Sequence, residues 1–164
     1  MTKTPVQFRL NGMAAATFAD PGANLLDVMR RGLGDLSAKY GCGQGTCGAC
    51  TVLIDGRPRL ACLTLAEEVE GRDVQSPGGI AGEALHPLQE AFMEHFAAQC
   101  GYCTPGMIAA AKALLDRNPR PDRDEVIEAL SGNICRCTGY EPIVEAVLTA
   151  AARLSGSNVA GGWR

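Results

Sequence analysis

Eight cysteines in a chain of 164 residues limit the possible folds more than any other feature of this sequence. The first four follow the pattern C-x4-C-x2-C with one distant cysteine, at Cys42, Cys47, Cys50 and Cys62. This spacing is typical of a plant-type [2Fe–2S] site. Glycines interleave with these cysteines and permit the close backbone wrap that a cluster requires. A structural zinc site usually takes two short cysteine pairs, so the loop fits zinc poorly.

The other four cysteines form a C-x2-C pair and a C-x-C pair in the second half, at Cys100, Cys103, Cys135 and Cys137. Each pair comes immediately before a predicted helix. Helix N-termini carry partial positive charge and free N–H groups, and two of them converging on an anionic cluster would stabilise its thiolates. A C-x-C pair is too tight for an ordinary zinc knuckle. The pattern therefore favours a second [2Fe–2S] cluster over a zinc site or spare thiols.

Charge and composition narrow the class of protein further. The net charge of −3 and the pI near 5.4 argue against a nucleic-acid partner. The N-terminal residues have neither an apolar signal core nor twin arginines, and no stretch is apolar enough to span a membrane. We therefore expect a cytoplasmic protein, with export on a signal-bearing partner as an alternative. Clustered cysteines in that compartment indicate metal or redox chemistry.

Strand signals dominate the first half of the chain. Residues 5–18 predict a β-hairpin that turns at Asn11-Gly12, and residues 51–62 predict a second hairpin that turns at Asp55-Gly56. A helix is expected at 24–31 between them. The second hairpin would place Cys62 at the end of a strand, within reach of the cysteine loop. This layout predicts a β-grasp ferredoxin domain over residues 1–76, followed by a Pro/Gly linker at 76–79.

Helical periodicity replaces the strand signals in residues 77–164. Helices are expected at 86–98, at 104–117 with Thr104 as N-cap, from Asp122 onward, and at 141–154. The apolar positions predicted to face the core include Phe96 and Ile127. These helices indicate a four-helix bundle with a flexible C-terminal tail from residue 155. The fold class is therefore α+β.

Two histidines are the remaining candidate metal ligands. His86 and His95 could ligate a Rieske-type centre. Because eight cysteines already supply two clusters, we interpret both histidines as surface or helix-packing residues.

Three runs, residues 41–51, 99–107 and 131–140, together closely resemble the small iron–sulfur subunit of the molybdenum hydroxylases, the xanthine oxidase and aldehyde oxidoreductase family. The resemblance extends over roughly residues 5–152. It implies a heteromeric oxidoreductase in which this chain relays electrons and has no substrate site of its own. A large subunit would hold molybdopterin, in bacteria often as the cytosine dinucleotide, and a medium subunit would hold FAD. A dimer of such heterotrimers is one assembly that the resemblance allows.

The resemblance also implies roles for particular residues. The cluster of Cys100, Cys103, Cys135 and Cys137 would lie next to molybdenum, and the cluster of the first quartet would lie toward FAD. Gln99 and Cys137 would contact the pterin.

Two other functions are compatible with the cysteines. One is a free-standing two-cluster electron carrier, which would not need a pterin-facing Gln99. The other is a zinc-stabilised interaction module, which would be colourless.

Overall fold

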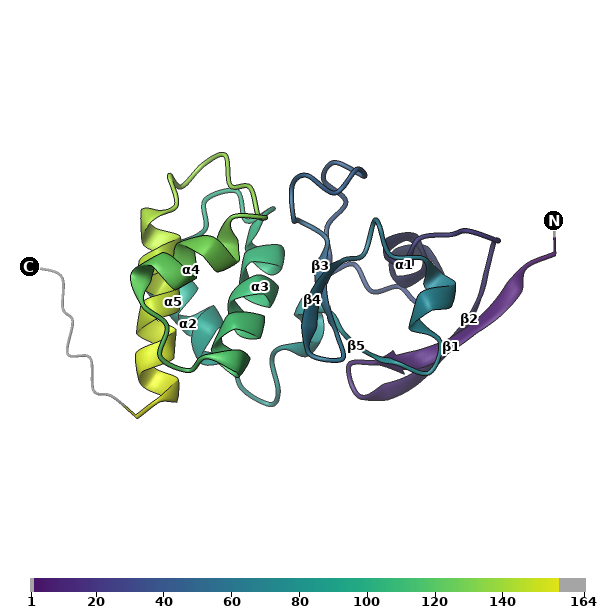
Figure 1. Cartoon of the computed structure of the whole chain (residues 1–164), viewed down its shortest axis with the longest axis horizontal. Coiled ribbons are helices and arrows are strands. Elements are labelled where there is room, and N and C mark those ends of the chain that lie inside the picture. Colours follow the sequence, from purple (N-terminus) through teal and green to yellow (C-terminus); the bar gives the residue numbers. More distant parts are fainter. Residues whose placement is uncertain (1, 157–164) are drawn as a thin grey trace, which may run out of the picture.

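The computed structural model describes residues 2–156, and most of the tail predicted from residue 155 lies outside them. A unit built on a β-sheet and a helical unit lie side by side along the longest axis (Figure 1). The α+β class is thus confirmed. Within residues 2–156, no helix combines the length and the apolar character that a membrane crossing needs.

The sheet has five strands in the order β2-β1-β5-β3-β4. Their bounds are β1 Thr4–Leu10, β2 Met13–Ala19, β3 Thr51–Ile54, β4 Arg57–Leu60 and β5 Asp73–Gln75. Both predicted hairpins are confirmed as the antiparallel pairs β1–β2 and β3–β4. Each turns on two residues with positive φ, Asn11-Gly12 and Asp55-Gly56, as a type I′ turn requires. The unpredicted strand β5 joins the hairpins by pairing parallel to β1 and antiparallel to β3.

The helix expected at 24–31 is present in an altered form. A short α-helix, α1 (Leu25–Asp27), continues into a π-helix, η1 (Val28–Gly32). Asn24 caps this segment, because its side chain accepts a hydrogen bond from the Asp27 amide. The segment supplies buried residues to the core beneath the sheet, together with the 3-10 helix η2 (Ala66–Val69).

The position expected for Cys62 needs a small correction. Strand β4 ends at Leu60, so Cys62 lies in the turn beyond the strand. The backbone amide of Ala61 still donates to the carbonyl of Cys50, which holds the two segments together.

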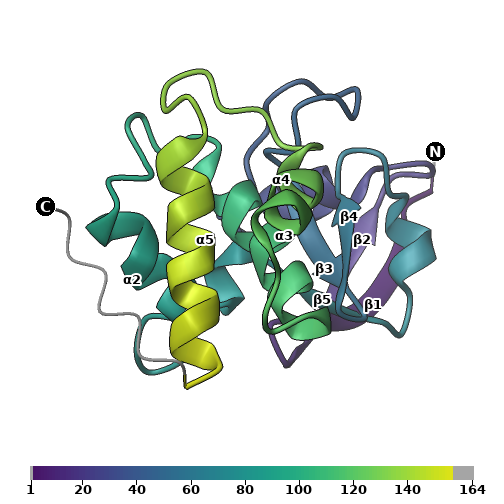
Figure 2. The same cartoon turned by 60° about the vertical axis from the view of Figure 1, so that its left-hand side comes forward.

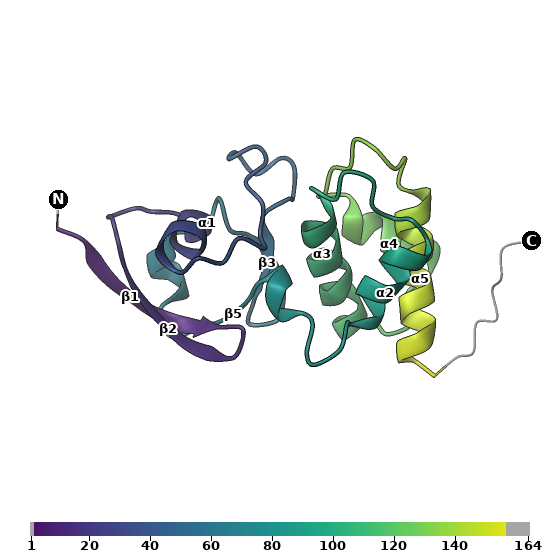
Figure 3. The same ribbon diagram turned by 180° about the vertical axis from the view of Figure 1, so that it is seen from behind.

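The bundle of the second unit is confirmed (Figure 2). It consists of α2 Pro87–Glu94, α3 Thr104–Arg117, α4 Arg123–Leu130 and α5 Glu141–Leu154. A short 3-10 helix, η3 (Pro77–Gly79), lies in the predicted linker. Helix α3 packs against β3 and β4, and so joins the two units (Figure 3).

Three predictions for the helices are wrong. Helix α2 ends at Glu94, and Phe96 adopts a left-handed φ of 51°, which turns its side chain out to 83% exposure instead of into the core. Ile127 is 49% exposed, because its neighbour Val126 occupies the inward face of α4. Cys103, not Thr104, is the N-cap of α3.

The two histidines take structural roles, as expected. His86 caps α2, because its Nδ1 accepts from the Leu88 amide at 3.2 Å. His95 Nε2 lies 2.8 Å from the Thr149 hydroxyl, so this ring links the end of α2 to α5.

Candidate metal centres

The first quartet lies on a loop and a turn that the second hairpin brings together. Cys42, Cys47 and Cys50 come from the loop before β3, and Cys62 follows β4. Because Thr51 and Leu60 are register partners in the hairpin, the residues just outside them also lie close together. Cys50 and Cys62 are buried, whereas the side chains of Cys42 and Cys47 are partly exposed.

The glycines around these cysteines allow the backbone to approach the sulfur atoms. A Cβ at Gly41 would lie 2.6 Å from Sγ of Cys47, and Gly43 and Gly45 have positive φ. The amide of Thr46 donates to Sγ of Cys42 at 3.3 Å. Such N–H groups stabilise a thiolate. The loop therefore has the geometry that an anionic metal–sulfur centre needs.

Burial and hydrogen bonding affect these thiols in opposite directions. Hydrogen bonds from Thr46, and then from Gln44 and Cys47, lower the pKa of Cys42 to about 6. Burial, followed by the neighbouring Cys62, raises the pKa of Cys50 to about 12. Metal binding at Cys50 would therefore displace a firmly held proton.

The second quartet lies where two loops of the bundle meet. Cys100 and Cys103 precede α3, and Cys135 and Cys137 lie on the loop between α4 and α5. Sγ of Cys137 is 3.6 Å from Sγ of Cys100. Burial, and then a hydrogen bond with Cys135, raises the pKa of Cys103 to about 12. The loop before α5 and the first cysteine loop project on the same side of the molecule (Figures 1 and 2).

Both pairs precede the helices as predicted. Cys103 occupies the N-cap position of α3 without a side-chain capping hydrogen bond, and residues 138–140 separate Cys137 from the start of α5. Two side chains of that segment contact the Cys135 region. The Thr138 hydroxyl donates to Sγ of Cys135 at 3.1 Å, and the Tyr140 hydroxyl accepts from the Cys135 amide at 2.9 Å. Although burial raises the pKa of Cys135, the hydrogen bonds from Thr138 and from the backbone lower it overall.

The cysteines of each quartet approach one another most closely in two pairs. The pairs are Cys42–Cys47, Cys50–Cys62, Cys100–Cys137 and Cys103–Cys135. None forms a disulfide. Among residues 2–156, no three side chains of His, Cys, Asp or Glu converge on a single metal ion. A [2Fe–2S] cluster has four thiolate ligands shared between two irons, so two sulfur pairs in each quartet fit it.

A hydrogen-bonded bridge connects the two quartets directly. The amide of Ile134, next to Cys135, donates to the carbonyl of Cys47 at 2.9 Å. Beside it, Nδ2 of Asn133 donates to the carbonyl of Gly48 at 2.9 Å. Sequence reasoning missed this bridge, because nothing in either motif shows that the two loops touch. The position of Asn133 and Ile134 immediately before Cys135 is the only hint.

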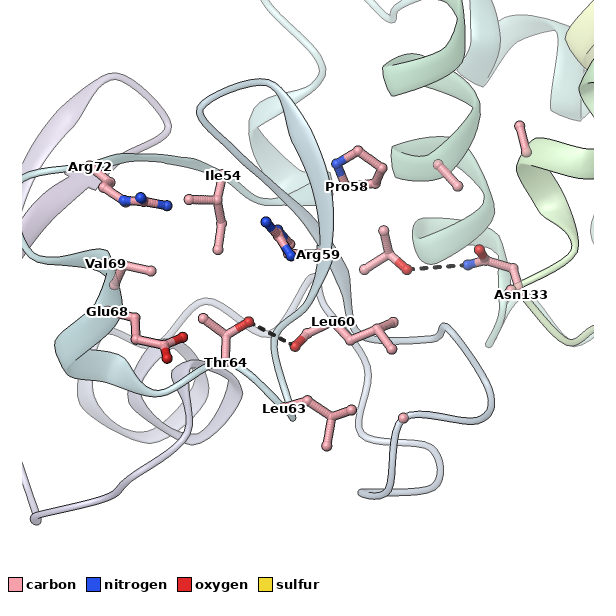
Figure 4. Close-up of a pocket in the computed structure, with 15 residues that line it drawn as sticks. Ile54, Pro58, Arg59, Leu60, Leu63, Thr64, Glu68, Val69, Arg72 and Asn133 are labelled. Atoms are coloured by element: carbon pink, nitrogen blue, oxygen red, sulfur yellow. Dashed lines mark hydrogen bonds between the residues drawn. The ribbon is translucent and has the colours of Figure 1, made fainter.

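A groove of about 570 Å³ borders this bridge. Its walls come from β4 and from the turn that follows it, and Asn133 closes the end nearest the bundle (Figure 4).

The second quartet has an exposed end and a buried end. Cys100 and Cys137 are exposed, whereas Cys103 and Cys135 are 9% and 8% exposed. Gln99 lies next to the exposed end and is itself exposed, and its side chain makes no hydrogen bond within residues 2–156. The structure thus groups Gln99, Cys100 and Cys137 as the accessible part of this centre.

Comparisons with known proteins find matches for both units of the chain. Residues 8–79 match the model of a 2Fe-2S iron-sulfur cluster binding domain, and residues 72–148 match that of a [2Fe-2S] binding domain. The chain is 45% identical to the nicotine 6-hydroxylase small subunit of Paenarthrobacter nicotinovorans over 95% of this chain and 94% of that protein.

Two solved structures are similar in fold. Quinoline 2-oxidoreductase from Pseudomonas putida 86 matches with a TM-score of 0.89 and 43% identity, over 96% of this chain and 100% of that one. The aldehyde oxidoreductase of Desulfovibrio desulfuricans matches with a TM-score of 0.91 and 47% identity, over 97% of this chain but 18% of that one.

Proposed function

Because this chain belongs to the iron–sulfur small subunits of the xanthine oxidase family of molybdenum hydroxylases, we propose that its eight cysteines are the ligands of two [2Fe–2S] clusters. The plant-type cluster takes Cys42, Cys47, Cys50 and Cys62, and the helical-domain cluster takes Cys100, Cys103, Cys135 and Cys137. The observation that carries this assignment is that the fold brings the cysteines of each quartet together: the hairpin register places Cys50 near Cys62, and Sγ of Cys137 lies 3.6 Å from Sγ of Cys100.

The protein is the electron-transfer subunit of a molybdenum-containing oxidoreductase and works with larger partner subunits. When bound, each cluster would supply one-electron redox chemistry. The chain's own residues hold the ligands, keep water from the buried sulfurs and fix the separation of the two sites. The Cys47–Ile134 hydrogen bond gives a short, mostly covalent route between the ligand sets.

The accessible end of the helical-domain cluster is proposed to face the molybdopterin of the large subunit. The exposure of Gln99, Cys100 and Cys137 on one side of the bundle supports this orientation. The amide of Gln99 can both donate to and accept from a pterin edge. Cys137 would touch the pterin while holding iron.

Further features of the complex follow from the same proposal. A medium subunit carries FAD near the partly exposed Cys42 and Cys47, two heterotrimers form the dimer, and the complex is cytoplasmic. Two separate hydrophobic cores, one ending at Val74 and one beginning at Ile80, support a domain boundary after residue 76.

Metal analysis tests the ligand assignment first. Purified complex should contain about four iron and four acid-labile sulfide per small subunit, two for each cluster. Zinc in place of iron in freshly isolated protein would refute the assignment.

Single substitutions then separate the two sites. Cys47→Ser should remove the EPR signal of the plant-type cluster, and Cys103→Ser should remove the signal of the helical-domain cluster. Loss of both signals from either substitution, in folded protein, would show that the division into two quartets is wrong.

Gln99→Ala tests the pterin contact. Both clusters should still assemble, while their reduction by substrate slows or molybdopterin is lost from the complex. Wild-type rates at full molybdenum occupancy would contradict the role. Isolation of the native chain as a lone monomer would instead favour a free-standing carrier.

A further inference from the structure

Asn133 is a buried polar side chain at the seam between the two units. It is 5% exposed and belongs to the bundle, near the start of the loop that leaves α4. Its Nδ2 donates across the seam to the carbonyl of Gly48 at 2.9 Å and contacts the Thr51 hydroxyl at 3.4 Å. Figure 4 shows the side chain extending from the bundle toward the sheet unit.

The backbone around Asn133 is packed too closely to admit a side chain. A Cβ at Gly48 would lie 2.5 Å from the carbonyl oxygen of Gly132 and 2.6 Å from Nδ2 of Asn133. A Cβ at Gly106, in the first turn of α3, would lie 2.3 Å from the carbonyl oxygen of Gly48. The first cysteine loop is therefore clamped between Asn133 and the start of α3.

This clamp acts on the residues next to the bridge. Gly48 comes directly after Cys47 in the sequence, and Asn133 comes directly before Ile134. The carbonyl of Cys47 accepts a hydrogen bond from the Ile134 amide. The side chain of Asn133 and the amide of Ile134 thus bind successive carbonyls of the same loop. Two parallel hydrogen bonds fix the loop in one orientation, which a single hydrogen bond between two loops does not.

We propose that Asn133 is a positioning residue that locks the first cysteine loop against the helical unit and so sets the contact between the two clusters. This inference rests on the proposed ligand assignment. An amide suits this buried position, because Nδ2 donates across the seam to the Gly48 carbonyl, which also accepts from the Thr51 hydroxyl at 2.7 Å. An aspartate of the same shape has no N–H and would place its charge against the Gly48 carbonyl.

The test compares matched variants in the assembled complex. Asn133→Asp keeps the size of the side chain and removes the donor, whereas Asn118→Asp makes the same change at the end of α3, where the amide donates to Glu125. Gly106→Ala adds a Cβ against the clamped loop, whereas Gly82→Ala adds one where no atom lies within 4 Å. Each complex is reduced fully with dithionite and measured by low-temperature EPR.

The readout is the magnetic splitting between the two reduced clusters. Asn133→Asp and Gly106→Ala should lose or shrink the splitting, while the g-values and midpoint potential of each cluster stay at their wild-type values. Asn118→Asp and Gly82→Ala should leave the splitting unchanged. A purely structural role for Asn133 would lower thermal stability without altering the splitting.

Two outcomes separate this inference from the function on which it rests. Wild-type splitting in both Asn133→Asp and Gly106→Ala, with full iron content, would overturn the positioning role and leave the ligand assignment intact. Wild-type complex without two distinct EPR signals would overturn the ligand assignment itself.

Discussion

Removing one hydroxyl, by Tyr140→Phe, should selectively destabilise the helical-domain cluster. The Tyr140 hydroxyl accepts from the amide of Cys135 at 2.9 Å and lies 3.4 Å from the carbonyl of Asn133. The tyrosine itself has a φ of 71°, so the backbone pays a conformational cost to place it there. Phenylalanine keeps the ring and leaves the Cys135 amide without its acceptor.

The size of the effect follows from the burial of that amide. Cys135 is 8% exposed, so water replaces the lost acceptor poorly. A buried donor left without a partner costs about 1–3 kcal/mol. We expect the lower part of this range, because Tyr140 is 36% exposed. If the cost falls on the intact site and is relieved when the site opens, about 1.4 kcal/mol corresponds to a factor of ten in rate, so the helical-domain cluster should be lost about ten times faster.

The assay follows both clusters in one sample. Complex is held at a raised temperature, and aliquots are reduced and examined by EPR over time. The signal of the helical-domain cluster should decay faster in Tyr140→Phe, while the signal of the plant-type cluster decays as in wild type. Ser155→Ala is the control, because it removes a hydroxyl that donates to the carbonyl of Ala152 at the opposite end of α5 from the cluster loop. Equal decay of the helical-domain signal in wild type and Tyr140→Phe would refute the reasoning.

Three further predictions concern the helices that carry this cluster. Burial, and then the charge of Lys112, lowers the pKa of His86 below its usual 6.5. Its capping contribution is therefore present above pH 6.5 and is lost as the pH falls through the lowered pKa. Amide exchange at Leu88, corrected for intrinsic rates, should lose protection over that fall in pH, and His86→Asn should abolish this dependence. Asp122→Ala removes the capping box of α4 and should lower the free energy of unfolding by about 1 kcal/mol, measured in a thermal melt. Asp124→Ala, at an exposed position of the same helix, should change it little. Met107→Ala leaves a cavity at a fully buried position in α3 and should lower the free energy of unfolding by about 2–5 kcal/mol, which would appear as a lower melting temperature of the complex.

Elements defined by local signals could be predicted from the sequence. Asn11-Gly12 and Asp55-Gly56 specify their own turns, and the structure has both. Helix α5 begins and ends where predicted, because Pro142 suits a first turn and the apolar positions repeat with helical period. The family resemblance of residues 99–107 and 131–140 was confirmed as well.

Features that depend on distant segments could not be predicted in this way. Strand β5 has three residues and one buried side chain, Val74, and it exists because β1 and β3 pair with it from either side. The exposure of Phe96 depends on where α2 ends, and a helical pattern cannot mark that point when the apolar residues continue past it. The Asn133 clamp could not be predicted from the sequence for the same reason, because its acceptor, Gly48, belongs to the other unit.

The burial of the two centres varies along the molecule in a way that suits a relay. The accessible pair, Cys100 and Cys137, lies at the end that we propose faces the large subunit, and Cys103 and Cys135 behind it are buried. The next step crosses the Ile134 amide to the Cys47 carbonyl, and beside it a Cβ added at Gly48 or Gly106 would clash with the facing backbone. The neighbouring hydrogen bond from Asn133 to Gly48 is buried, so little solvent competes for its donor. Exposure at the ends lets partners approach the clusters, and close packing in the middle keeps their separation constant.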